Sequence, residues 1–126
     1  MKIAFILITG RNDSGWSKML YETLLNLGSV QIVFEDDVDS RVSEASFDLI
    51  VLDACAVKDS AMLVSQLCSL RPRLRILVTT AAPNWREARD ILRAGAVDYY
   101  LWPQNREELF SVIQDALNLP SLNGDD

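Results

Sequence analysis

The stretch FDLIVLD, residues 47–53, is an apolar run with β-branched residues at its centre and one carboxylate, Asp53, at its end. A run of this length and composition is typical of a strand that is covered on both faces inside a parallel sheet. Such a central strand ends at the carboxyl edge of the sheet, where open α/β sheets bind their ligands. We therefore expect Asp53 to lie at the floor of the functional crevice.

On both sides of this stretch the chain alternates apolar runs with segments of helical periodicity. The expected strands cover residues 2–9, 30–34, 47–53, 74–80 and 97–101. The expected helices cover residues 14–27, 40–45, 60–70, 84–94 and 105–117. Their short connections favour right-handed βαβ units, with helices on both faces of one parallel sheet. The predicted fold class is α/β, a flavodoxin-like three-layer sandwich with five strands in the order 2-1-3-4-5.

Several boundaries in this scheme rest on single residues. Gly28 is expected to stop the first helix, because glycine is common just after a helix C-terminus. Val42 and Ala45 are the apolar pair of the short second helix. Asn84, with Glu87 three residues later, is typical of a capping box, in which each side chain bonds to the backbone N–H of the other residue.

Composition limits the classes of function. The 126 residues carry a formal net charge of −6, which opposes a direct nucleic-acid partner, and 49% of them are apolar, as expected for a globular domain. The chain has no histidine and only two cysteines, which excludes histidine-based catalysis, a thiolate metal site and a disulfide framework. No apolar run is long enough to span a bilayer, and we expect a cytoplasmic location. Residues 1–118 are expected to form the domain, and residues 119–126 a linker or tail.

The predicted strand order brings the ends of the first, third and fourth strands together. The crevice at that edge is expected to contain residues 9–13, Asp53 and either Thr79 or Thr80, with Trp102 at its rim. The loop TGRNDSG, residues 9–15, leads into a helix N-terminus. This loop allows the alternative of a domain that binds a flavin or a nucleotide.

Three stretches in order, FDLIVLD, ILVTTA and AGAVDYYLWP, resemble the receiver domain of two-component response regulators. The resemblance covers nearly the whole chain, residues 2–117. It implies that Asp53 is the position that accepts a phosphoryl group from a histidine kinase. It also implies that Thr80 bonds to that group and that Tyr99 is the aromatic switch that then turns inward. Thr80 is preferred to Thr79 because alanine follows it, as in the family.

The departures from the family's pattern predict a pseudo-receiver. A receiver carries two adjacent acidic residues after its first strand, which hold Mg²⁺, whereas this chain has Thr9-Gly10 or, aligned from the first helix, Arg11-Asn12. A receiver also carries lysine before the proline of its last motif, where this chain has Trp102. Phosphoryl transfer depends on neutralising the phosphoryl oxygens, so phosphorylation of Asp53 is expected to be weak or absent.

No cofactor is expected under this interpretation. The alternative is a rebuilt Mg²⁺ site, in which Asp13, Glu35 or Asp36 lends a carboxylate to the ion. That alternative would give a phosphorylatable receiver.

The remaining way for the domain to act is contact with other proteins. We expect no enzymatic activity, no membrane contact, and protein partners: a histidine kinase, an effector domain or a second copy of the chain. The helix over residues 84–94 carries Trp85, Arg86, Arg89 and Arg93 around its outer side, and tryptophan and arginine are enriched at interfaces. We expect these residues to form an interaction face. The alternative is that the arginines only solvate the helix and pair with neighbouring acids.

Overall fold

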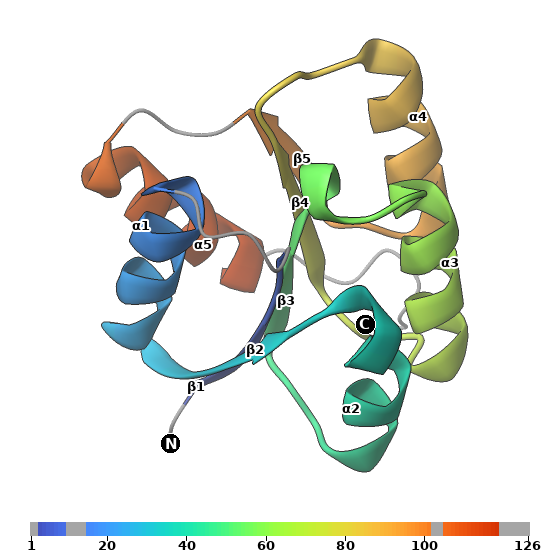
Figure 1. Cartoon of the computed structure of the whole chain (residues 1–126), viewed down its shortest axis with the longest axis horizontal. Helices are drawn as coiled ribbons and strands as arrows, with labels where there is room; N and C mark the ends of the chain where they lie inside the picture. Colours follow the sequence, from blue (N-terminus) through green and yellow to red (C-terminus); the bar gives the residue numbers. More distant parts are fainter. Residues whose placement is uncertain (1–2, 10–14, 102–104, 119–126) are drawn as a thin grey trace.

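The structure, a computed structural model, describes residues 3–9, 15–101 and 105–118 (Figure 1). Its elements follow the chain in the order β1 (Ile3–Ile8), α1 (Gly15–Leu25), β2 (Gly28–Val33), η1 (Glu35–Asp37), α2 (Val38–Glu44), β3 (Leu49–Asp53), η2 (Ala54–Ala56), α3 (Ser60–Leu70), β4 (Ile76–Thr80), α4 (Trp85–Ala94), β5 (Asp98–Leu101) and α5 (Arg106–Asn118). The expected tail, residues 119–126, lies outside the described residues.

The strands form one parallel sheet in the order β2-β1-β3-β4-β5, which confirms the predicted fold class. Helices α1 and α5 cover one face of the sheet, and α2, α3 and α4 cover the other (Figure 1). The carboxyl ends of β1, β3 and β4 meet at the same edge. Among the described residues, no helix is long and apolar enough to cross a membrane.

Strand β3 supplies both layers of the core. Ile50 and Leu52 belong to the cluster under α2, α3 and α4, whereas Leu49 and Val51 belong to the cluster under α1 and α5. All four side chains are fully buried. This alternation explains why the stretch is one continuous apolar run, because both faces of a central strand are covered by helices.

The sequence predicted that Gly28 stops the first helix, but this residue begins β2 instead. Helix α1 ends at Leu25, and Gly28 is already paired with Ile3 in the parallel ladder. A Cβ atom at position 28 would lie only 2.0 Å from the carbonyl oxygen of Ile3. Glycine is therefore required by the close approach of two strands and not by a helix end.

Helix α2 begins two residues earlier than predicted, at Val38, and its apolar pair is different. Val38 and Val42 are fully buried, while Ala45 is exposed and already extended. The i, i+4 spacing of the two valines places both on the side facing the sheet. The expected pair of Val42 and Ala45 was wrong for this reason.

Candidate functional site

Polar side chains are buried at the carboxyl edge of the sheet, where the sequence predicted a crevice. Thr9 follows β1 and is 8% exposed, Asp53 ends β3 and is 7% exposed, and Thr79 and Thr80 end β4 at 0% and 2%. Strand pairing places Asp53 directly opposite Thr79. Residues 10–13 and Trp102, which the sequence also assigned to this crevice, lie outside the described residues.

Asp53 is a buried carboxylate with a backbone partner. Its Oδ1 accepts a hydrogen bond of 3.0 Å from the backbone N–H of Cys55, in the turn that opens η2. Burial raises the pKa of Asp53 above its ordinary value, and the hydrogen bond from Cys55 offsets part of the rise. In the described residues, no arginine or lysine forms an ion pair with this carboxylate.

The candidate metal ligands do not gather around Asp53 in the part of the chain that the structure describes. Glu35 and Asp36 lie in η1, after β2, and strand β1 separates β2 from β3. Two strand spacings amount to roughly 10 Å. Within the described residues no group of three or more His, Cys, Asp or Glu side chains is placed to hold a metal ion. Asp13 lies outside those residues, so the described donors offer Mg²⁺ one carboxylate and do not fit the two-acid site of the family.

The two threonines at the end of β4 have different partners. The Thr79 hydroxyl donates to the backbone oxygen of Leu52 at 3.3 Å, which ties β4 to β3. The Thr80 hydroxyl accepts from the backbone N–H of Ala82 at 3.1 Å, and it acts to lower the pKa of the nearby Tyr99 hydroxyl. The structure therefore brings together Thr80 and Tyr99, the two positions that the sequence analysis assigned to the switch.

Tyr99 is held against the start of α4 by its hydroxyl group. The hydroxyl donates to Glu87 Oε1 at 2.8 Å and lies 3.3 Å from the backbone nitrogen of Asn84, whose N–H it accepts. Burial, and next the hydrogen bond to Glu87, raise the pKa of Tyr99 above its ordinary value. The ring packs against the core cluster under α2, α3 and α4, so Tyr99 is directed into the domain and not away from it.

The sequence predicted a capping box of Asn84 and Glu87, but Glu87 does not complete it. Half of the motif is present, because Asn84 Oδ1 accepts from the N–H groups of Arg86 and Glu87 at 2.8 and 3.3 Å. The other half is replaced: the Asn84 N–H bonds to the Tyr99 hydroxyl, which in turn bonds to Glu87. Tyr99 thus stands between the two residues that would otherwise bond to each other.

Comparisons with known proteins give the same picture as the fold. No family model matches the chain. The transcriptional regulatory protein ZraR of Salmonella typhimurium is 32% identical over 82 residues, which make up 64% of this chain and 19% of that protein. A response regulator of Burkholderia pseudomallei, solved with a phosphorylated aspartic acid, a calcium ion and citrate, is 26% identical with a TM-score of 0.75, over 92% of this chain and 66% of that one. A CheY-like receiver domain of Methanospirillum hungatei is 18% identical with a TM-score of 0.80, over 94% of this chain and 95% of that one.

The chain has the fold of response-regulator receiver domains and resembles them in sequence. It spans only a small part of the curated relatives that it matches. The resemblance stated from the sequence is confirmed, whereas the qualifier pseudo-receiver remains a prediction.

The predicted interaction face of the receiver domain lies on the exposed side of α4. Trp85 is 68% exposed, and the guanidinium carbons of Arg86 and Arg89 each lie 5.4 Å from the centre of its ring. Arg89 also pairs with Asp90 at 3.4 Å, and Arg93 is exposed. The arginines are therefore ordered around the tryptophan, and only Arg89 forms an ion pair with a neighbouring acid within the described residues.

Sequence analysis missed the part that Glu87 plays in the receiver domain. The spacing of Asn84 and Glu87 was correctly recognised, but its explanation was local. The contact could be predicted only by pairing the switch tyrosine with an acid in the first turn of the preceding helix. That pairing is visible only once β5 is known to lie beside α4 (Figure 1).

Proposed function

We propose that this receiver domain acts by protein–protein contact through α4, β5 and α5, with phosphorylation at Asp53 weak or absent. The observation that carries the proposal is the bonded state of Tyr99. Its hydroxyl accepts from the backbone N–H of Asn84 and donates to Glu87, and both partners lie at the start of α4. The aromatic switch thus joins β5 to the start of α4, and the face around it is proposed to form without a trigger.

The surroundings of Asp53 support the second half of the proposal. An incoming phosphoryl group is an anion, and its repulsion from a carboxylate is about 4 kcal/mol at 4 Å in a surface-like dielectric. Receivers offset this repulsion with Mg²⁺ and a lysine, and this sequence has Trp102 at the lysine position. Burial raises the pKa of Asp53, and no described arginine or lysine forms an ion pair with it.

Side chains on α4, β5 and α5 have the composition of an interaction surface. Apolar residues that remain exposed on these three elements are Trp85, Leu92, Leu101 and Phe110, at 68, 38, 50 and 41%. Arg86, Arg89 and Arg93 add positive charge to α4 in a chain whose net charge is −6. A partner that presents an apolar patch rimmed by acids fits this face, and a second copy of the chain or an effector domain is the proposed partner. The domain is proposed to have no enzymatic activity and to work in the cytoplasm.

The test combines phosphorylation with association. The chain is incubated with acetyl phosphate and Mg²⁺, its intact mass is measured for an added phosphoryl group, and self-association and effector binding are measured by sedimentation. We expect little added mass and the same association with and without phosphodonor. Trp85→Ala and Arg89→Glu are expected to weaken association about tenfold, as interface anchors do. Met62→Ala and Arg41→Glu are the matched controls, since both residues are exposed on other helices.

Two results would contradict the proposal in different ways. Unchanged association in both α4 variants would show that this face is not the interface. Association that appears only with phosphodonor, and disappears in Asp53→Asn, would show a working receiver with a rebuilt Mg²⁺ site.

A further inference from the structure

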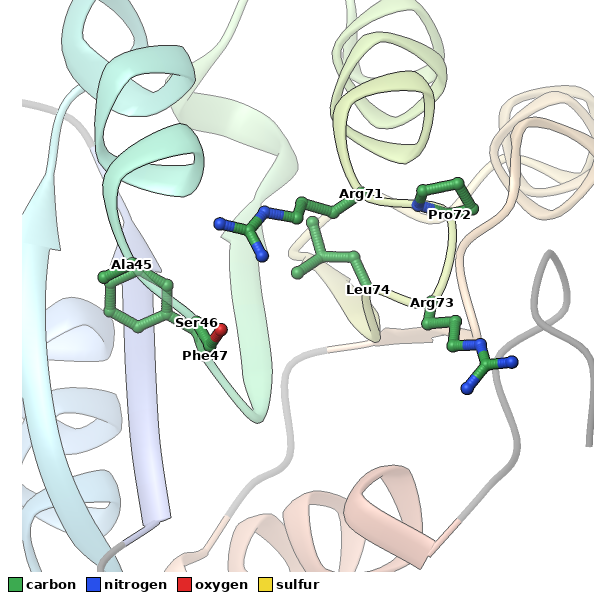
Figure 2. Close-up of a pocket in the computed structure, with 7 residues that line it drawn as sticks. All are labelled: Ala45, Ser46, Phe47, Arg71, Pro72, Arg73 and Leu74. Atoms are coloured by element: carbon green, nitrogen blue, oxygen red, sulfur yellow. The ribbon is translucent and has the colours of Figure 1, made fainter.

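A pocket of about 420 Å³ lies at the amino edge of the sheet, opposite the edge that carries Asp53. Two connections form its walls: residues 45–47, between α2 and β3, and residues 71–74, between α3 and β4 (Figure 2). Its volume is within the range of small-molecule sites in proteins. No residue of the Asp53 crevice or of the α4 face contributes to it.

The inner surface of the pocket is apolar. Phe47 is half-buried and packs against the core cluster under α2, α3 and α4, and Leu74 is 6% exposed. Figure 2 shows the Leu74 side chain between the two connections, with Ala45 and Phe47 on one side and Pro72 on the other. A hydrophobic group that enters the pocket would meet this surface, which is already rigid because it belongs to the core.

The mouth of the pocket carries positive charge. Arg71 reaches from the end of α3 toward the end of α2 (Figure 2), where it donates to the backbone oxygen of Ser43 at 3.3 Å. A guanidinium has five N–H donors. Within the described residues, the Arg71 side chain forms one hydrogen bond, the bond to Ser43. Arg73 is exposed. Neither arginine forms an ion pair with a described carboxylate. Of the two acids that flank residues 45–47, Asp48 is bonded to the backbone N–H of Ala4 at 2.7 Å, and Glu44 is exposed.

We propose that this pocket binds a small organic carboxylate with an apolar body, such as an aryl-substituted fatty acid. The carboxylate bonds to Arg71, whose planar guanidinium matches the two oxygens, and Arg73 adds to the positive potential at the mouth. The apolar body lies on Phe47, Leu74 and Pro72. Charge favours this class of ligand, since an acidic protein has here an apolar pocket beside arginines that no described acid neutralises.

Binding at this pocket would join two connections that lead into the central strands. Residues 45–47 precede β3, which ends at Asp53, and residues 71–74 precede β4, which ends at Thr80. A ligand that bonds to Arg71 and packs on Phe47 therefore holds these two segments together. The proposal is independent of the signalling role, because it involves neither Asp53 nor the α4 face.

The experiment is a titration of the ¹⁵N-labelled full chain with 4-phenylbutyrate, followed by amide chemical shifts. We expect saturable shifts confined to residues near the two connections. The neutral analogue 4-phenylbutan-1-ol is expected to bind about tenfold more weakly, and acetate, which lacks the apolar body, to cause no saturable shift; a tenfold change corresponds to about 1.4 kcal/mol.

Variants assign the effect to the arginines. Arg71→Gln is expected to reduce affinity for 4-phenylbutyrate about tenfold and to leave affinity for the alcohol unchanged. Arg73→Gln is expected to reduce it about threefold, and it decides the matter if Arg71→Gln loses its folded spectrum. Lys58→Gln removes the same charge at the opposite edge of the sheet and is expected to change nothing. Equal affinity of the acid and the alcohol for the wild type, an equal loss in Lys58→Gln, or shifts spread over the whole chain would overturn the proposal.

Discussion

Asp53 and Tyr99 are two ionisable side chains near the same edge of the sheet, and their hydrogen-bond partners differ. Asp53 has one backbone N–H within reach, and burial raises its pKa. The Tyr99 hydroxyl both donates and accepts, and its two partners lie at the start of α4. Within the described residues, the corner that performs the reaction in a receiver has fewer hydrogen bonds than the corner that responds to it.

The difference between Asp53 and Tyr99 indicates that the sequence specifies the switch position more strongly than the phosphoacceptor position. A hydrogen-bonded network at Tyr99 fixes the position of α4 by contacts that exist without any ligand. A single buried carboxylate at Asp53 contributes nothing comparable to stability. The two corners should therefore respond very differently to substitution.

The largest effect is expected from removing the Tyr99 side chain. Tyr99→Ala loses the ring that packs on the core as well as the hydroxyl network, and should lower the free energy of unfolding by about 2–3 kcal/mol. Tyr99→Phe keeps the ring and should cost about 1 kcal/mol, the contribution of a partly buried hydrogen bond. Urea unfolding followed by circular dichroism measures both. If the two variants were equally stable, the ring would contribute nothing, and the packing side of the comparison would be wrong.

Removing the carboxylate partner of Tyr99 is expected to have the next largest effect. Glu87→Ala leaves the hydroxyl bonded to Asn84 and should lower the free energy of unfolding by about 1 kcal/mol. Asp90→Ala, on the exposed side of the same helix, is the control and should cost less than about 0.5 kcal/mol. The double variant Tyr99→Phe/Glu87→Ala should cost less than the sum of its parts, because the two residues share one bond. Additive costs would mean that the 2.8 Å contact contributes nothing to stability.

Stability should fall at alkaline pH through Tyr99. Its folded-state pKa is raised, so the folded chain holds the phenol proton more tightly than the unfolded chain does. The unfolded state therefore gains relative stability as pH rises above the ordinary tyrosine pKa toward the folded value. Unfolding measured from pH 8 upward should show a decline that is smaller in Tyr99→Phe. An identical decline in that variant would assign the effect to other groups.

The smallest effect is expected at Asp53. Asp53→Asn removes a buried charge but keeps the oxygen that accepts from Cys55, so the free energy of unfolding at pH 7 should be unchanged or higher by less than about 1 kcal/mol. Because the folded-state pKa is raised, the charge opposes folding above that pKa and not below the ordinary Asp value. The advantage of the variant should therefore disappear as the pH falls. A loss of more than about 1 kcal/mol in Asp53→Asn would show that the ionised carboxylate is a structural acceptor.

Part of this comparison could be predicted from the sequence and part could not. The alternation of apolar runs predicted the strand order and the place of Asp53, because burial on one or both faces leaves a period in the chain. The pairing of Asn84 with Glu87 was predicted as a local motif, and the structure gave Glu87 a partner 12 residues away in sequence. Gly28 was assigned to a helix end, and the structure uses it where β2 approaches the carbonyl of Ile3.

The sequence by itself determined an α/β fold of the receiver type, with an aspartate at the end of its central strand. Tertiary structure alone decided that Tyr99 bonds to Glu87, and that Arg71, bonded to Ser43 28 residues earlier, stands beside the pocket of Phe47 and Leu74. The physical reason is the range of the interactions involved. The periodicity of apolar residues in the sequence reflects which side chains are buried and which are exposed. A hydrogen bond between two side chains depends instead on angstrom-scale distances, which packing sets between distant segments.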